Sequence, residues 1–150
     1  MGGTFHGATV ITLDAKGRLA LPTRHRDALS AGKSELVLTA HPVGCLLLYP
    51  MDAWEPVRSK VEKFPSLDMQ ASWWKRLLLG HEEHLTPDAS GRILISPALR
   101  MYAKLERELV MFGQGSYFEL WDHGQWTAKL TQAMAQPSST PPPGMEGFSL

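Results

Sequence analysis

The 150-residue chain contains two copies of one pattern, and this internal repeat limits its possible folds more than any other feature. Residues 13–21 (LDAKGRLAL) align with residues 87–95 (PDASGRILI), 74 positions later. The match continues downstream as the offset falls to 73 and then 72, between residues 36–38 and 109–111, 45–49 and 117–121, and Trp54 and Trp126. Such a collinear series predicts two diverged copies of one structural unit.

Each copy begins with a tight turn that follows one short strand and precedes another. Asp occupies the first position of this turn in both copies, and Gly occupies the fourth. An aspartate there can accept hydrogen bonds from the amides of the turn, and a glycine can adopt the positive φ that closes a hairpin with a bulge. We therefore expect structural roles in the turns for Asp14, Gly17, Asp88 and Gly91.

Helical signals follow each turn and also separate the copies. In the second copy we expect Ser96 to be an N-cap and Pro97 to take the first helical position. Apolar residues recur at helical spacing between the copies, where we expect Asp52 to start a helix and Pro56 to lie in its first turn.

The sequence predicts an α+β, β-rich fold, because 43% of the residues are hydrophobic and strand and helix patterns alternate. The run PSSTPPPG from residue 137 cannot form a helix or a sheet. We expect repeat 1 at 5–50, linking helices at 51–80, repeat 2 at 81–124, a C-terminal helix at 125–135 and a flexible tail at 136–150.

Residues 13–22 and 88–100, which share the pattern Asp-x-x-Gly-Arg, resemble the SpoVT–AbrB (swapped-hairpin) motif. Two copies with tryptophan-bearing helices between them resemble the MraZ family, bacterial regulators of the division and cell-wall gene cluster, over roughly residues 5–135. The resemblance implies that the repeats form an intramolecular pseudo-dimer barrel with peripheral helices. It also implies ring-shaped homo-oligomers that bind direct repeats in promoter DNA, usually as repressors.

Under this resemblance, the candidate DNA contacts are basic residues in and near the turns. The net charge of the chain is zero, but residues 1–34 hold five basic and two acidic residues, and phosphate attraction requires only a local basic face. The candidates are Lys16, Arg18, Arg24 and Arg92. Ser90 replaces the lysine of the first turn, so we expect Arg92 to contribute less than Arg18.

An alternative role is open for each of these arginines. Arg18 and Arg92 could instead form structural ion pairs with the turn aspartates. For Arg26 and Arg100, which align between the copies, a structural role is the better prediction.

The helical stripe of Trp73, Trp74, Leu77 and Leu78 has two interpretations. Such a stripe is usually part of a hydrophobic core, but a chain this short has few interior places for five tryptophans. We therefore also consider the stripe a candidate subunit interface. A protein-interaction module, such as an antitoxin that binds its partner through the tail, is the alternative function.

The sequence shows no recognisable catalytic frame. His81 and His84 are three residues apart and follow a glycine, whereas the metalloprotease pattern requires four on a helix. Cys45 lies in an apolar strand, where a thiol is usually a small buried hydrophobe. We expect no enzyme activity, no metal and no cofactor.

The expected location is the cytoplasm, in association with the nucleoid. Cys45 is the only cysteine, so no intrachain disulfide is possible, and the first residues lack the features of a secretory leader. The longest apolar run, residues 45–49, is far too short to span a bilayer, so we expect no membrane partner.

Overall fold

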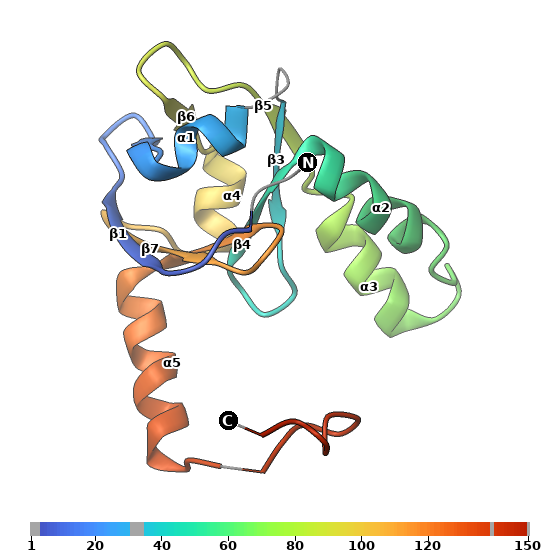
Figure 1. The fold of residues 1–150 in the computed structure, drawn as a ribbon. Coiled ribbons are helices and arrows are strands. Elements are labelled where there is room, and N and C mark those ends of the chain that lie inside the picture. The colour runs from blue at the N-terminus through green and yellow to red at the C-terminus, as the bar shows by residue number, and fades with distance from the viewer. Residues whose placement is uncertain (1–3, 31–34, 139, 150) are drawn as a thin grey trace.

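A computed structural model describes residues 4–30, 35–138 and 140–149. The predicted α+β, β-rich class is confirmed, and the copies contain corresponding elements in the same order (Figure 1). The first copy contains β1 (Ala8–Thr12), β2 (Arg18–Ala20), α1 (Thr23–Ser30), β3 (Leu36–Ala40), β4 (Leu46–Pro50) and α2 (Met51–Glu62). The second contains β5 (Glu83–Leu85), β6 (Arg92–Leu94), α4 (Pro97–Tyr102), β7 (Glu108–Gly113), β8 (Phe118–Asp122) and α5 (His123–Ala135), and α3 (Met69–Leu78) lies between them.

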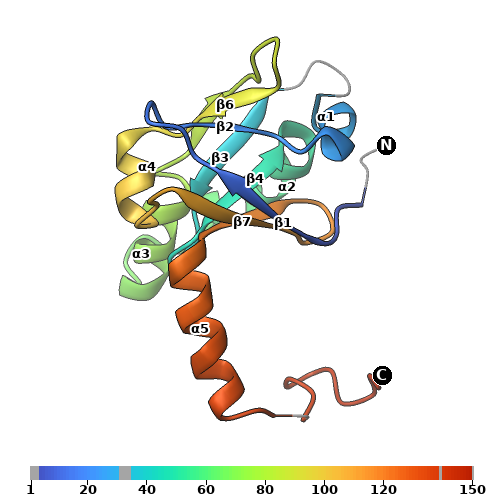
Figure 2. The same ribbon diagram turned by 90° about the vertical axis from the view of Figure 1, so that its left-hand side faces the viewer.

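The strands form two antiparallel sheets whose order is symmetric between the copies. The larger sheet has the order β1-β7-β8-β4-β3-β5, and the smaller sheet pairs β2 with β6. Exchanging each strand for its counterpart in the other copy reproduces the same order, read backwards. This order indicates that the two copies are related by a pseudo-two-fold axis. Figure 2 shows the β2–β6 pair lying above strands of the larger sheet.

The copies exchange strands, so neither could form the larger sheet alone. β1 pairs with β7 of the second copy, and β5 pairs with β3 of the first. β1 and β2 were expected to flank a turn, and they do, but each finds its ladder in the other copy. The expected closed barrel is not observed among the described strands, because β1 and β5 are edges of the larger sheet.

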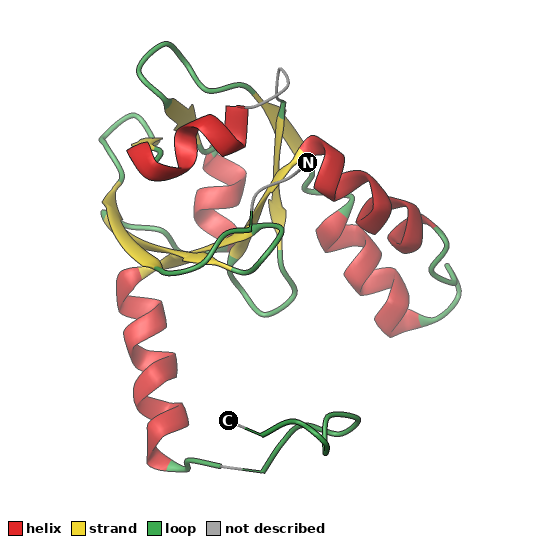
Figure 3. Cartoon of the chain, viewed as in Figure 1, coloured by secondary structure: helices red, strands yellow, loops and turns green. Residues whose placement is uncertain are grey.

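The apolar hairpin β3–β4 is buried on both faces, which explains why its sequence shows no alternation. Leu38 and Leu48 face the main core, which also contains the buried residues of β2 and β6. Val37 and Tyr49 face the opposite side, where α2 and α3 pack against the sheet (Figure 3). Alternate residues of one strand therefore belong to two different clusters.

The start of α4 agrees with the sequence prediction, whereas the N-cap of α2 does not. The Ser96 hydroxyl accepts a hydrogen bond from the Leu99 amide, and Pro97 is the first residue of α4, as predicted. The prediction that Asp52 starts α2 was wrong, since the N-cap is Pro50. Pro56 consequently lies inside α2, beyond the first turn, where its missing N–H leaves the Asp52 carbonyl without that helical partner.

α5 leaves the body of the molecule after its first turn (Figure 1). Trp126 packs against Phe112 and Trp121, with ring centroids 4.7 and 5.5 Å apart, and the following residues of the helix are exposed. Residues 137–138 and 140–149 contain no helix or strand. In the part of the chain that the structure describes, no helix is long and apolar enough to cross a membrane.

Candidate nucleic-acid interface

Loop 1, residues 14–17, is closed by the side chain of its first residue. One carboxylate oxygen of Asp14 accepts hydrogen bonds from the amides of Lys16, at 2.9 Å, and of Arg18, at 2.8 Å. Gly17 adopts a φ of 85°, in the left-handed region that favours glycine. The lysine and the arginine are therefore held at fixed positions around one carboxylate.

Loop 2, residues 88–91, repeats this geometry almost atom for atom. The Asp88 carboxylate accepts from the amides of Ser90, at 2.8 Å, and of Arg92, at 2.9 Å, and Gly91 has a φ of 77°. The side chains at the tips differ, because loop 2 carries the Ser90 hydroxyl where loop 1 carries the Lys16 ammonium group.

Each loop glycine is covered by an arginine of the other copy. A Cβ atom added to Gly17 would lie 2.8 Å from the Arg100 guanidinium carbon, and one added to Gly91 would lie 2.6 Å from Nε of Arg26. Arg26 also donates from Nε to the Leu21 carbonyl at 2.8 Å. This geometry supports the structural role expected for both covering arginines, which pack against the loops.

β2 and β6 form a short ribbon between the loops. The ladder pairs Arg18 with Leu94 and Ala20 with Arg92 around a central pair of buried residues, Leu19 and Ile93. It is extended at both ends by the bonds Ile95 N to Gly17 O and Leu21 N to Gly91 O, at 2.8 and 2.9 Å. We call residues 17–21 and 91–95 the ribbon; its outer face carries Arg18, Ala20, Arg92 and Leu94.

Both outer-face arginines form the structural ion pairs that were the alternative to a DNA role. Nε of Arg18 lies 2.9 Å from Asp14 Oδ2, and Nε of Arg92 lies 3.0 Å from Asp88 Oδ2. Their side chains are still 32% and 38% exposed, and within the described residues their terminal nitrogens make no further hydrogen bond. The ion pair therefore orients each arginine while leaving its two terminal nitrogens, which carry four N–H donors, for an outside acceptor.

The aspartates stay charged in this arrangement. The hydrogen bond from the Arg18 amide, helped by the Arg18 side chain, lowers the pKa of Asp14, and the corresponding bonds from Arg92 lower the pKa of Asp88. Each loop therefore carries an arginine that is held in place by a charged aspartate, rather than a freely moving one.

The ribbon has two chemically different ends. End 1, next to loop 1, combines Lys16 and Arg18 with Leu94, whose side chain is 55% exposed. End 2, next to loop 2, has Ser90, Arg92 and Ala20 at the corresponding positions. Leu94 was not among the residues predicted for this site, although the alternation from the buried Ile93 and Ile95 places it on the face of Arg92.

Arg24, the remaining basic residue predicted to contact DNA, does not lie on the ribbon. It belongs to α1, and its side chain donates to the Thr9 hydroxyl at 2.7 Å and to the His25 ring at 3.1 Å. It is exposed but tied to β1. Lys33, which contributed to the expected basic N-terminal region, lies outside the described residues.

The expected interface stripe on α3 is divided by the fold. Leu77 and Leu78 are only 4% and 7% exposed, because they pack into the two hydrophobic clusters, so they are core residues rather than part of an exposed face. Trp73 and Trp74 are exposed at 54% and 40%. The predicted stripe is therefore not one surface: its leucines belong to the core, and only its tryptophans face solvent.

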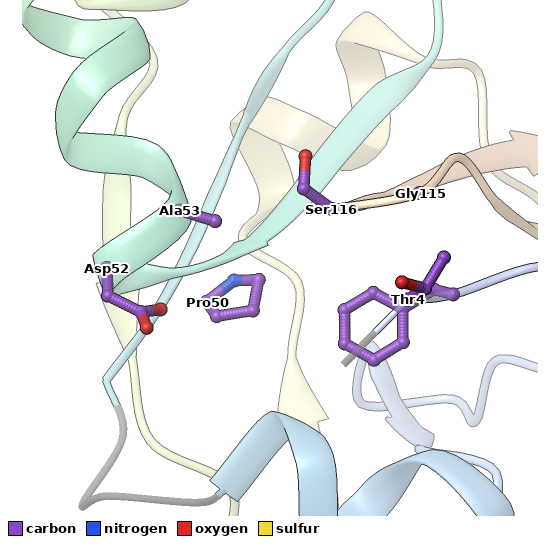
Figure 4. A pocket seen from close by; sticks show the side chains of 7 residues that line it. Thr4, Pro50, Asp52, Ala53, Gly115 and Ser116 are labelled. Carbon is purple, nitrogen blue, oxygen red and sulfur yellow. The ribbon is translucent and has the colours of Figure 1, made fainter. Parts of the chain in front are cut away.

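Other regions offer little for catalysis. A pocket beside the start of α2 is lined mostly by small side chains and backbone, and among the described residues Asp52 is its only ionisable side chain (Figure 4). His84 is engaged by Glu82, with 2.6 Å between Nε2 and the carboxylate, and no group of three or more potential metal ligands occurs in the described residues. Cys45 is fully buried, and burial raises the pKa of its thiol.

Comparison with known proteins decides the family. A family model described as "MraZ protein, putative antitoxin-like" matches residues 4–77 and again residues 78–147. The chain belongs to the MraZ family. The tandem match agrees with the two copies found in the sequence and with the symmetric sheets of the structure.

Several MraZ relatives are similar over nearly their whole length. A protein of Methylobacillus flagellatus named "Transcriptional regulator MraZ" is 52% identical over 147 residues, covering 97% of this chain and 99% of that protein. Proteins with the same name from Dechloromonas aromatica and Aromatoleum aromaticum are 50% identical over 141 residues and 46% identical over 146 residues. They cover 93% and 97% of this chain and 95% and 99% of their own lengths.

Proposed function

We propose that this MraZ-family chain is a sequence-specific DNA-binding transcriptional regulator, and that the outer face of the ribbon is its DNA-contacting surface. The observation that carries the proposal is the pair of exposed arginines on this face, each oriented by a turn aspartate through Nε. The relatives named as transcriptional regulators support the same function.

The physical fit to duplex DNA is good. The major groove of B-DNA admits a two-stranded ribbon, and an arginine can donate two hydrogen bonds to the acceptors of one guanine. With Nε held by the aspartate, the two terminal nitrogens of Arg18 are free to make such a bidentate contact. One contact of this kind contributes about 1–3 kcal/mol of discrimination between bases.

Lys16 and Arg24 supply charge rather than base recognition in this proposal. Lys16 is exposed at the tip of loop 1, where a phosphate contact requires no rearrangement of the turn. Arg24 reaches a phosphate only if its bonds to Thr9 and His25 rearrange, so it ranks below the loop residues.

A single ribbon neutralises few phosphates, so one subunit alone binds weakly and with strong salt dependence. We infer that several subunits act together, as a ring-shaped homo-oligomer whose ribbons meet successive direct repeats in a promoter, because linking weak sites raises their combined affinity. The exposed Trp73 and Trp74 are candidates for the contact between subunits. The family resemblance extends this to repression of the division and cell-wall gene cluster.

The proposal is tested by a gel-shift with DNA from upstream of the protein's own gene, run over a salt series. The wild-type chain should shift this DNA and lose affinity steeply as salt rises. Arg18→Ala should abolish the shift while the circular dichroism spectrum and the sedimentation coefficient stay unchanged. An Arg18→Ala protein that binds as the wild type does would refute the ribbon as the DNA surface.

A second function, binding of a protein partner in the manner of an antitoxin, is favoured by the family description and by the exposed segment after α5. Removing residues 136–150 separates the two functions. An antitoxin should fail to bind its protein partner after this deletion, whereas a DNA-binding regulator should keep its gel-shift.

A further inference from the structure

The backbone of the ribbon is symmetric, but its outer face is not. The ladder pairs and the flanking bonds are equivalent on the two sides of the central pair, Leu19 and Ile93. The outer face, in contrast, has Leu94 at end 1 and Ala20 at the corresponding position of end 2. A protein with equal ends would bind a duplex equally well in two opposite orientations.

Leu94 is a large apolar side chain on an exposed face that also carries two arginines. More than half of its side chain is exposed, whereas its neighbours Ile93 and Ile95 are buried, at 1% and 0% exposed. Its ladder partner is Arg18, and side chains of directly paired residues on one face have Cβ atoms about 4.5–5.5 Å apart. The exposed leucine therefore lies directly beside the arginine that contacts the base in the proposed function.

The major groove offers one apolar feature to such a side chain, the C5-methyl group of thymine. Neighbouring bases of one strand are stacked roughly 3.4 Å apart along the helix axis. A leucine about 5 Å from an arginine on the same face can thus reach the base pair next to the one that the arginine contacts.

We propose that Leu94 contacts a thymine methyl group beside the base contacted by Arg18, and that this contact gives the pseudo-symmetric ribbon one preferred orientation on its DNA. The inference rests on the proposed function, because it assigns a role to Leu94 within the same surface. Lys16 acts in the same sense, since it adds a positive charge at end 1 that Ser90 does not supply at end 2. The preferred site is accordingly not a palindrome.

The test begins with the full-length protein and a library of random DNA duplexes. The wild-type protein should enrich a non-palindromic site containing at least one thymine, while Leu94→Ala should relax the preference at that thymine. In the enriched duplex, each thymine is then replaced in turn by deoxyuridine, which removes only the methyl group.

Removing the contacted methyl group should weaken wild-type binding about fourfold per site, as expected for about 0.8 kcal/mol of apolar burial. Leu94→Ala should bind the methylated and unmethylated duplexes equally. Val43→Ala is the matched control: Val43 is also exposed and apolar, at 48%, but lies in the turn between β3 and β4, so its sensitivity should equal that of the wild type.

A second variant tests the orientation directly. Ala20→Leu places a leucine at end 2 and makes the outer face nearly symmetric, so the enriched site should become more palindromic and gain a second sensitive thymine. If the variant enriches the wild-type site unchanged, the leucines do not determine the orientation.

The outcomes distinguish this inference from the function on which it rests. If Arg18→Ala enriches the same site as the wild type, the ribbon is not the DNA surface and both fail. If Arg18→Ala no longer binds but no thymine methyl matters to the wild type, or Leu94→Ala keeps the wild-type sensitivity, the function stands and the inference is wrong. A changed sedimentation coefficient for Leu94→Ala would assign Leu94 to a subunit contact and overturn it as well.

Discussion

Loop 1 and loop 2 share a backbone and differ in their chemistry. Both are closed by an aspartate that bonds two amides, both contain a glycine at positive φ, and both are covered by an arginine from the other copy. Only loop 1 carries a lysine at its tip and an exposed leucine across the ladder.

The two loops therefore distinguish the residues that the turn needs for folding from those that can differ for binding. The shared residues are those that the turn and its packing require, so both copies need them for folding. The differing residues face solvent and touch nothing that the fold depends on, so they are free to specialise for binding. We therefore expect substitutions of the turn aspartates and glycines to destabilise the two loops equally, whereas the residues that differ should make the two loops contribute unequally to DNA binding.

Replacing the two outer-face arginines should change DNA affinity more than any other substitution of the loops. Arg18→Ala should reduce DNA affinity roughly 5- to 150-fold per site, which corresponds to about 1–3 kcal/mol for a bidentate base contact. Arg92→Ala should reduce it less, because loop 2 lacks the lysine that brings phosphate close. Fluorescence anisotropy at fixed salt measures both, and equal reductions would contradict the ranking.

Exchanging the residues at the loop tips, Lys16 and Ser90, tests how much the charge of each loop contributes to DNA binding. Lys16→Ser should reduce the slope of log affinity against log salt by about 0.9 for each phosphate that the variant no longer neutralises, and Ser90→Lys should increase it if loop 2 also faces DNA. Titrations at four or five salt concentrations give the slope. A Lys16→Ser protein with an unchanged slope would show that this side chain does not meet phosphate.

The glycines test the equality of the two loops in folding. Gly17→Ala and Gly91→Ala should each destabilise the protein by at least about 1–2 kcal/mol, because a Cβ atom is disfavoured at positive φ and would also meet the covering arginine. Urea unfolding followed by circular dichroism measures the destabilisation. A large effect in one variant alone would show that the loops are not structurally equivalent.

A weaker effect is expected on the pH dependence of stability, at a position where the two copies have different residues. His25 of α1 packs against Phe5 and Phe118, and burial, helped by the charge of Arg24, lowers the pKa of His25 below its ordinary 6.5. The unfolded chain therefore binds this proton more readily, so stability should fall as the pH drops through 6.5 toward the lower folded pKa.

Repeat 2 has Leu99 at the position of His25, which provides the matched variant. His25→Leu should remove this part of the pH dependence, and urea midpoints at pH 5, 6, 7 and 8 would show it as a smaller decline than in the wild type. An identical decline in both proteins would assign the effect to other groups, such as His41, whose pKa is also lowered by burial.

Much of the fold could be predicted because its signals are local. The turn aspartates and glycines, the Ser96 cap and the two apolar hairpins each depend on residues that are close in sequence. The N-cap of α2 was predicted wrongly, because an acidic residue in the first turn of a helix resembles an N-cap in the sequence. The N-cap in the structure is Pro50, whose backbone is extended.

The candidate site was predicted only in part, for a similar reason. The basic residues of the turns are visible in the sequence, but Leu94 looks like any strand leucine until the buried face of β6 is known. Leu77 and Leu78 likewise shared a predicted stripe with exposed tryptophans, and only packing against the two cores divided them.

It follows from the amino-acid sequence alone that the chain is duplicated, that each copy has an aspartate-closed turn, and that the first turn is the more basic. Those properties depend on the identities of neighbouring residues. The tertiary structure alone decided that β1 and β5 exchange between the copies, that each turn is packed by an arginine of the other copy, and that both turns flank one ribbon. These interactions join residues far apart in the sequence, and strand pairing over such separations is selected by the burial of the whole core rather than by any local pattern.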